Sequence, residues 1–302
     1  MIPYKKIRPL IIGKNISYSI GTNGGTKLLL RDIGTEEKPF IIHDIVREDV
    51  PNQGQIVAVV GRSGGGKSTF FNLLSGINKP TTGEIFVPKC TSSTEGGSCE
   101  KCDADLQENG HCLIKVKEGL VGFVQQHYPL SRNQTVYGML WDATIMGKVP
   151  RNQRKDLILS TLDEWGLYEQ RYNAGSELSG GQQQRVAIIE QLLCSHHFMI
   201  LDEPFSGLDP KNTQGLLTSF KKITTTDEIN TIFFSTHIIH LAVEFADMIY
   251  VIGYEKDEKG YNLPGGTIIK EYDLKEMGLA WTPYGQQHLE LKLEIENIIK
   301  TN

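Results

Sequence analysis

A glycine-rich segment at residues 61–69 carries the clearest chemistry in this chain. It reads Gly-Arg-Ser-Gly-Gly-Gly-Lys-Ser-Thr and fits the pattern G-x-x-x-x-G-K-[ST], between a β-branched run at 56–60 and a helical pattern. Glycines let successive backbone N–H groups converge on a phosphate chain, and the helix adds its positive N-terminal end. Lys67 is expected to neutralise the β- and γ-phosphates, and Ser68 to ligate Mg²⁺. The predicted phosphate-binding residues are Gly61, Ser63, Gly64, Gly65, Gly66, Lys67, Ser68 and Thr69.

An acidic pair follows an apolar run further along the chain. Residues 198–201 are Phe-Met-Ile-Leu, which predicts a buried strand, and Asp202 and Glu203 come directly after it. Asp202 is expected beside the phosphate loop, where its carboxylate can hold the Mg²⁺ shell. Glu203 is then placed to polarise an attacking water. Such a pair alone would also fit a solvated strand end or the start of a helix, but the phosphate loop upstream favours the metal site.

A second possible anion site lies at 178–182, where the sequence is Leu-Ser-Gly-Gly-Gln. A helical pattern follows at 182–194, and Ser179 is a good N-cap residue for it. Two glycines leave the helix end open to an anion. Alone, the segment would fit an ordinary capped helix. Its position shortly before the strand that carries the acidic pair favours an anion site instead.

Four of the five cysteines lie close together in a polar, glycine-rich stretch. A C-x-x-C pair places two thiolates on one turn, and two flanking cysteines can complete a tetrahedral Zn²⁺ site that gives the stretch a fold. His111 could replace one ligand. A redox switch and four uncoordinated thiols are the rival interpretations, whereas Cys194 is interpreted as a core residue. The predicted structural zinc ligands are Cys90, Cys99, Cys102 and Cys112.

Short β-rich runs alternate with helical patterns, which predicts an α/β domain on a mostly parallel sheet. Strands are expected at 56–60, 198–201, 231–234 and 248–252, and helices at 182–194, 210–222 and 238–245. Residues 89–119 are interpreted as an insertion with little core of its own, and 136–172 as a helical subdomain. The tail from residue 281 fits either a strand, by alternation, or a helix face.

Composition narrows the class of protein. Of the 302 residues, 39% are hydrophobic, which is ordinary for a globular protein. The net charge of −5 gives no reason to expect nucleic acid as a partner. No apolar run approaches the roughly 18 residues that cross a bilayer, and the N-terminus lacks the apolar core of a signal peptide. We therefore expect a soluble, cytoplasmic protein.

The motifs together resemble the ATP-binding cassette (ABC) ATPase family over about residues 5–272. Segments 61–69 and 198–203 are similar to its Walker A and Walker B motifs, and 178–182 to its signature. The resemblance implies a RecA-like P-loop core with an antiparallel β subdomain and an α-helical signature subdomain. It places the nucleotide-binding domain at 1–272, with the insertion at 89–119, the helical subdomain at about 127–178, and a C-terminal extension at 273–302.

The resemblance also assigns residue roles. It implies that Glu203 orients the attacking water, that His237 contacts the γ-phosphate, and that Gln126 senses Mg²⁺ together with Ser68 and Asp202. Two cassettes would meet head to tail, each ATP lying between Walker A of one and the signature of the other. The remaining nucleotide contacts that it implies are Tyr18, stacked on adenine, Ser179, Gly180, Gly181 and Gln182 of the signature, and Asp209 of the D-loop.

A cassette of this kind has two natural roles. It is either the ATPase subunit of a membrane transporter or a soluble ABC ATPase acting in DNA repair, chromosome handling, translation or cluster assembly. The single cassette, the absence of long heptads and the size of the helical subdomain favour the transporter. That interpretation implies integral membrane subunits and a second cassette as partners, ATP and Mg²⁺ as cofactors, and a peripheral position on the inner face of the cell membrane.

Overall fold

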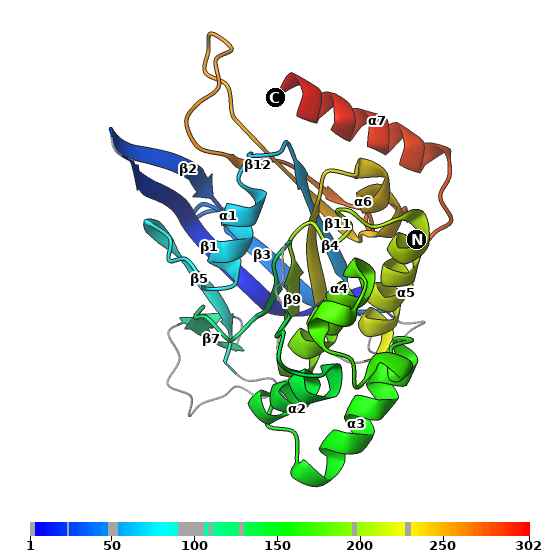
Figure 1. The fold of residues 1–302 in the computed structure, drawn as a ribbon. Helices are drawn as coiled ribbons and strands as arrows, with labels where there is room; N and C mark the ends of the chain where they lie inside the picture. The colour runs from blue at the N-terminus through cyan, green and yellow to red at the C-terminus, as the bar shows by residue number, and fades with distance from the viewer. Residues whose placement is uncertain are drawn as a thin grey trace.

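The computed structural model describes residues 4–22, 24–47, 54–89, 106–108, 111–126, 130–194, 198–226 and 231–302. Two six-stranded sheets and the helices around them make up this part of the chain (Figure 1). The strands are β1 Tyr4–Thr22, β2 Gly25–Ile33, β3 Phe40–Arg47, β4 Ile56–Gly61, β5 Thr82–Pro88, β6 Leu106–Glu108, β7 His111–Lys115, β8 Gly122–Val124, β9 Phe198–Leu201, β10 Thr231–Thr236, β11 Met248–Gly253 and β12 Thr267–Asp273. The helices are α1 Lys67–Leu74, α2 Val136–Met146, α3 Arg151–Glu164, α4 Gly180–Cys194, α5 Pro210–Thr226, α6 Ile239–Phe245 and α7 Gln286–Thr301, with short 3₁₀ turns η1 Tyr168–Gln170 and η2 Gly175–Glu177.

The central sheet has the strand order β12-β11-β4-β10-β9-β8. All neighbours in it are parallel except the edge pair β11 and β12. All six residues of β4 are buried, as expected for a strand covered on both faces. Because parallel strands end at the same edge of a sheet, the segments that follow β4, β9 and β10 meet there. The four strands expected from the apolar runs are confirmed.

Alternate residues of β4 divide the interior into two cores. Val57 and Val59 face one side, where they pack with Phe70 and Phe71 of α1 and with the antiparallel sheet. Ala58 and Val60 face the other side, toward the cluster that α4, α5, α6 and α7 cover. This alternation is the period of two that a strand imposes on its side chains. Helix α1, which carries the phosphate loop at its start, is therefore held between the two sheets.

The antiparallel sheet has the order β2-β1-β5-β7-β6, with β3 also paired to β1. Its long strand β1 pairs with β2, β3 and β5 in turn. Residues 111–115, at the end of the expected insertion, form β7 and pair with β5. Leu113 on β7 is fully buried with Ile12 and Phe86. This part of the insertion therefore belongs to the core of the β subdomain, contrary to the expectation that it would have little core.

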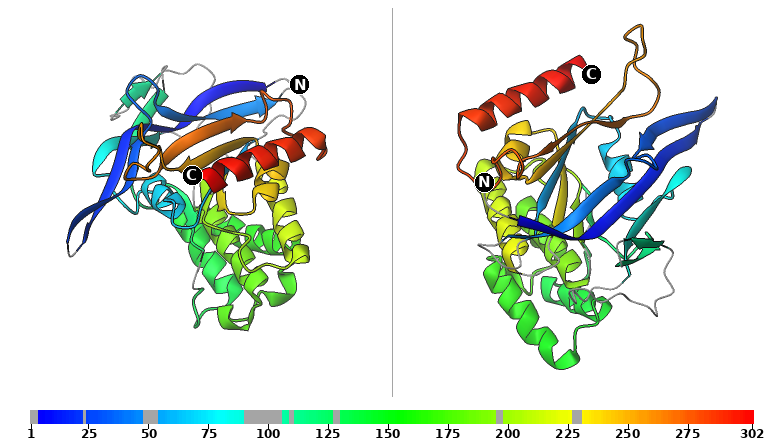
Figure 2. Two further views of the ribbon diagram at one scale, coloured as in Figure 1. Left: turned by 90° about the horizontal axis from the view of Figure 1, so that it is seen from above. Right: turned by 180° about the vertical axis from the view of Figure 1, so that it is seen from behind.

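The C-terminal residues 286–301 form the helix α7, which settles the ambiguity between strand and helix. Leu291 and Ile295, one turn apart, are buried in the main core, while Leu289 and Leu293 are exposed. Figure 2 shows α7 along the outside of the molecule, at the opposite end from α2 and α3. Among the described helices, none has the length and apolar character that a membrane span requires.

Candidate nucleotide-binding site

The phosphate loop joins the end of β4 to the start of α1. A Cβ atom at Gly61 would collide with the carbonyl oxygen of Ile252 on the neighbouring strand, so only glycine fits there. Gly66 is the N-cap residue of α1, with φ of 104°, a backbone conformation that favours glycine. No side chain caps this helix end. The first N–H groups of α1 are therefore free to bind an anion, as the sequence predicts.

Lys67, the first residue of α1, is held inside the loop. Its side chain is 6% exposed, and Nζ donates hydrogen bonds to the carbonyl oxygens of Gly61 at 3.0 Å and Arg62 at 3.2 Å. The same Nζ lies 3.5 Å from Oε1 of Glu203. A buried ammonium group needs such partners to offset its desolvation. The loop thus holds a fixed positive charge at its centre.

The acidic pair stands at the end of β9 and is supported by β10. Ser235 on β10 donates a hydrogen bond of 2.6 Å to Oδ1 of Asp202, and its oxygen accepts the N–H of Glu203 at 2.8 Å. Glu203 has φ of 49°, an unusual conformation for a residue with a side chain. Strain of this kind occurs at functional sites where the surroundings hold the residue in place. Sequence reasoning did not assign this bridging role to Ser235.

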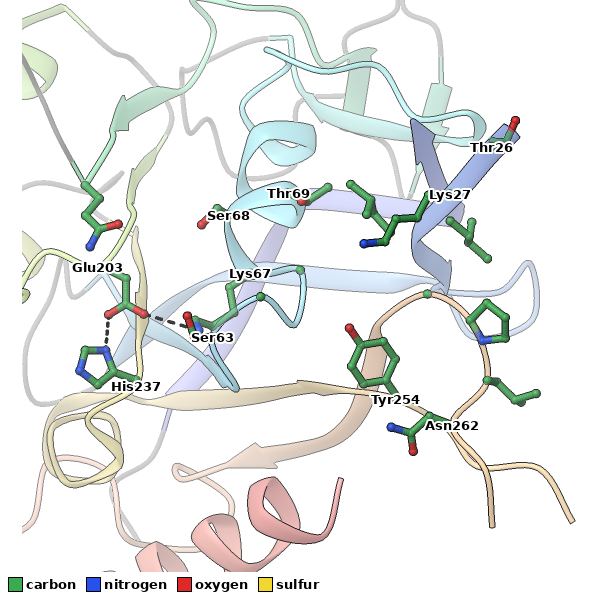
Figure 3. A pocket seen from close by; sticks show the side chains of 18 residues that line it. Thr26, Lys27, Ser63, Lys67, Ser68, Thr69, Glu203, His237, Tyr254 and Asn262 are labelled. Atoms are coloured by element: carbon green, nitrogen blue, oxygen red, sulfur yellow. Dashed lines mark hydrogen bonds and ion pairs between the residues drawn. The ribbon is translucent and has the colours of Figure 1, made fainter. Parts of the chain in front are cut away.

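His237 follows β10 and lies beside Glu203, on the side away from Lys67. Its Nδ1 lies 2.9 Å from Oε2 of Glu203, so the carboxylate lies between the imidazole and Lys67 (Figure 3). The Glu203 side chain is 14% exposed, while that of His237 is 60% exposed. A largely buried carboxylate whose position is fixed on both sides is suited to orient a water molecule.

These residues line a pocket of about 780 Å³. It brings together the phosphate loop, the end of β9, the turn after β10 and Gln126, which follows β8. The sequence-predicted residues that line it are Ser63, Gly64, Gly66, Lys67, Ser68, Thr69, Gln126, Glu203 and His237. Sequence reasoning missed a second group of lining residues, 26–29 at the start of β2 together with Tyr254 and 262–265. The run Pro-Gly-Gly at 264–266 marks that loop in the sequence but says nothing of its position.

Tyr18 does not line this pocket. It lies on β1, where it pairs with Leu30 of β2, and its side chain is half-buried against the core beneath the antiparallel sheet. The predicted stacking of Tyr18 on adenine therefore has no support in this arrangement. Tyr254 is the tyrosine that lines the pocket.

The signature segment lies apart from this pocket. Ser179 caps α4 with a reciprocal pair of hydrogen bonds, its N–H to Oε1 of Gln182 at 2.9 Å and the Gln182 N–H to its Oγ at 3.4 Å. Ser179 and Gly180 are exposed. Gly181 lies against the side chain of Asn212 on α5, so a residue with a Cβ atom there would require Asn212 to shift. The N-terminal end of α4 therefore faces outward from its own chain.

The segment after β8, which holds Gln126, and the segment after Glu203 lie between the pocket and the start of α5. Nε2 of Gln126 donates to Oγ of Ser206 at 3.3 Å, in the segment that follows Glu203. Asp209, three residues further on, caps α5 by accepting the N–H of Asn212 at 2.9 Å. Asp209 itself is exposed and does not line the pocket.

The oxygen donors present fit Mg²⁺. The Ser68 hydroxyl and the Gln126 amide line the pocket, and the buried Asp202 carboxylate lies at the adjoining strand end. Oxygen ligands of this kind, completed by phosphate oxygens and water, are what Mg²⁺ prefers.

The zinc prediction falls mostly outside the described residues. Cys90, Cys99 and Cys102 lie there, while Cys112 is buried on β7. The described part of the chain holds no group of three or more His, Cys, Asp or Glu side chains suited to a metal ion. The zinc site thus stays a prediction from the sequence. Burial, followed by the charge of Glu190, raises the pKa of the Cys194 thiol to about 11, so this cysteine stays protonated.

A glycine-rich loop between a parallel strand and a helix, with an acidic pair at the end of a neighbouring strand, defines a P-loop nucleotide-binding protein. Comparison with known sequences narrows this class. A family profile described as ABC transporter matches residues 50–206. The chain belongs to this ABC transporter family.

Curated relatives share about a third of their residues with this chain. Methionine import ATP-binding protein MetN 1 of Bacillus licheniformis is 30% identical over 76% of this chain and 63% of its own length. Phosphonates import ATP-binding protein PhnC 1 of Oceanobacillus iheyensis is 32% identical over 70% of this chain and 79% of its own length. The chain therefore spans less than two thirds of the MetN relative.

Solved structures share the fold. A dimeric bacterial ABC transporter cassette matches with a TM-score of 0.62 at 24% identity, over 88% of this chain and 99% of its own. An ATP-binding subunit of an ABC transporter matches with a TM-score of 0.63 at 20% identity, over 95% of this chain and 99% of its own. The expected RecA-like P-loop fold is confirmed.

Proposed function

We propose that this chain binds ATP with Mg²⁺ and hydrolyses it at the site formed by Lys67, Glu203 and His237. The observation that carries the proposal is the position of Glu203, whose two carboxylate oxygens face Lys67 and His237 within one pocket. Among the described residues that line the pocket, Glu203 is the one with a carboxylate side chain.

The residues divide the chemistry among them. Lys67 and the N–H groups of α1 bind the phosphates, and Glu203 orients a water toward the γ-phosphate and accepts its proton. His237 holds Glu203 in place and stabilises the negative charge that develops on the γ-phosphate. Mg²⁺, when bound near Ser68, Gln126 and Asp202, supplies further neutralisation of the phosphates.

The proposed active unit contains a second copy of the cassette. The exposed N-terminal end of α4, at Ser179 and Gly180, presents the positive end of the helix dipole to solvent and does not line the pocket of its own chain. The γ-phosphate region is open on the side of His237, which is 60% exposed. A partner's α4 would close that side and surround the γ-phosphate with donors. Glu203 would then act in a site shielded from water.

The proposed role of hydrolysis is to drive an import transporter from the cytoplasmic face of a membrane. The relatives named above are import ATP-binding proteins. The helical subdomain exposes Ile145, Met146 and Tyr172, which suit contact with a membrane-spanning partner. Purification of tagged protein from detergent-solubilised membranes is expected to recover a multi-span protein, and recovery should fall in Met146→Glu. Equal recovery from both proteins contradicts the proposed contact surface at Met146, and recovery from neither contradicts the transporter role.

A substitution in the signature tests whether the second cassette acts in trans. Ser179→Arg places bulk and charge at the exposed end of α4 and leaves the phosphate loop of the same chain intact. We expect the monomer to bind ATP normally while turnover falls about 100-fold or more, the typical loss when a positioned donor to a transition-state charge is removed. Steady-state hydrolysis and equilibrium ATP binding measure the two effects.

The dimer itself is measured in a background that cannot hydrolyse ATP. Glu203→Gln with and without Ser179→Arg is compared by size-exclusion chromatography with ATP and Mg²⁺, and dimers are expected only without the arginine. Ser176→Arg is the matched control, because Ser176 is exposed in η2 and lies outside the helix cap. ATP-dependent dimers of normal stability in the Ser179→Arg double variant contradict the trans arrangement.

A further inference from the structure

A second cleft, of about 520 Å³, lies between the start of the phosphate loop and the helix α7. The turn after β10 and the start of α6, which α7 contacts, complete its walls (Figure 1). Ser63 and His237 line this cleft and the nucleotide pocket as well. These two residues therefore form the boundary between the two spaces.

Cations outnumber carboxylates on the walls of this cleft. Arg62 comes from the phosphate loop, and Lys292 and Lys300 come from α7, while Glu296 is the one carboxylate among the described residues that line it. Glu296 lies 3.5 Å from Nζ of Lys292. Arg62 and Lys300 have no carboxylate partner in the described part of the chain. The cleft is therefore locally positive in a chain whose net charge is −5.

The end of α7 that carries Lys300 is fixed in place by the loop that follows β11. Nζ of Lys256 donates a hydrogen bond to the Thr301 carbonyl at 2.7 Å, and the N–H of Tyr254 donates to Oδ1 of Asn302 at 3.1 Å. A charge on a held element keeps its position before a ligand arrives, which lowers the entropy cost of binding. The cleft is thus an ordered feature of the fold.

The cleft adjoins the end of the nucleotide pocket where hydrolysis is proposed. Nδ1 of His237 lies 2.9 Å from Oε2 of Glu203, the residue proposed to orient the attacking water. The phosphate that is split from ATP therefore forms next to the boundary with the cleft. In the proposed dimer, ADP fills the rest of the pocket and a partner's α4 covers its open side, so the boundary at Ser63 and His237 is the wall nearest to the product.

From this arrangement we infer that the cleft between the phosphate loop and α7 is a binding site for inorganic phosphate, through which the product of hydrolysis leaves. Guanidinium and ammonium groups donate charge-assisted hydrogen bonds to phosphate oxygens, and Arg62 and Lys300 supply one of each. The His237 side chain is 60% exposed, so it has room to turn away from the boundary. The inference rests on the proposed function and deepens it by naming the route of its product.

The test separates cleavage of ATP from release of phosphate. In a single turnover of Mg-ATP, acid quenching measures all phosphate formed, and a fluorescent phosphate-binding sensor measures phosphate free in solution. Lys300→Glu puts a negative charge on the route of the anion. Two unit charges about 4 Å apart in water change an equilibrium by about 5-fold, so reversing one charge against phosphate is expected to slow release by about 10-fold. Cleavage should keep the wild-type rate.

Two further variants make the test quantitative. Lys300→Gln changes the charge by half as much as Lys300→Glu, so it should slow release by only about 3-fold. Lys155→Glu is the matched control, because it makes the same charge reversal at an exposed position on α3, outside both the cleft and the nucleotide pocket. Its phosphate release should match that of the wild-type protein. Added salt should shrink the delay in Lys300→Glu.

Three results would overturn the inference. Release that keeps pace with cleavage in Lys300→Glu would show that phosphate leaves elsewhere. An equal delay in Lys155→Glu would trace the effect to net charge instead of the cleft. Slower cleavage in Lys300→Glu, together with weaker ATP-dependent dimers in the Glu203→Gln background, would mean that the cleft binds the second cassette. A wild-type protein that forms no phosphate would instead disprove the proposed function.

Discussion

Glu203→Gln is expected to lower the rate of ATP hydrolysis by about 100-fold or more while ATP binding is retained. The amide keeps the shape of the side chain and can still form a hydrogen bond with His237, but it has no negative charge opposite Lys67 and cannot accept a proton from water. General-base catalysis of this kind contributes about 10²–10⁴ to the rate. Steady-state phosphate release measures the loss, and size-exclusion chromatography with ATP and Mg²⁺ should show a dimer that persists.

The control for this substitution is Glu276→Gln, which makes the same chemical change at an exposed position outside the pocket. Its hydrolysis rate should equal that of the wild-type protein. A Glu203→Gln protein that hydrolyses ATP at nearly the wild-type rate would show that another group activates the water. A protein that loses ATP binding together with hydrolysis would place Glu203 in binding instead of catalysis.

Lys67→Ala is expected to lower the affinity for Mg-ATP by about 100-fold or more, and hydrolysis with it. The substitution removes the positive charge at the centre of the phosphate loop and leaves Glu203 without its cationic neighbour. Hydrogen bonds to charged groups contribute about 1.5–3 kcal/mol each, and Lys67 is expected to contact two phosphates. Isothermal titration calorimetry with Mg-ATP measures the change.

An exposed lysine close to the same helix provides the comparison. Lys79→Ala removes one positive charge beyond α1, outside the pocket, and ATP affinity should be unchanged. The Lys67→Ala and Glu203→Gln variants are also expected to differ from each other, because Glu203→Gln retains ATP and Lys67→Ala does not. Nearly wild-type affinity in Lys67→Ala would mean that the loop binds phosphate without this lysine.

Local patterns in the sequence were sufficient to predict the phosphate end of the site. The glycines, Lys67 and Ser68 lie within a few residues of one another, and the loop conformation follows from glycine backbone freedom and the helix that begins there. The apolar runs at β4, β9 and β10 were long enough to predict buried parallel strands. Parallel strands bring their carboxyl ends together, so the proximity of Glu203 to Lys67 follows from topology.

The helix α7 shows where a pattern alone is ambiguous. Leu289, Leu291, Leu293 and Ile295 alternate as in a strand, yet only Leu291 and Ile295 are buried. Helix α7 packs against α6 and β11, where the main core accepts one apolar helix face. Packing against the rest of the protein decided the secondary structure here, because both periodicities satisfied the local sequence.

The wall of the pocket that Tyr254 and Asn262 form and the support of the acidic pair depended wholly on tertiary structure. Tyr254 and Asn262 are far in sequence from Lys67, and Ser235 reaches Asp202 only because β10 lies beside β9. The sequence by itself was sufficient to predict the buried strands β4, β9, β10 and β11 and the phosphate loop, since these depend on neighbouring residues. That Tyr254 lines the pocket and Tyr18 does not was decided by the packing of distant segments, because contacts between distant segments leave no local pattern.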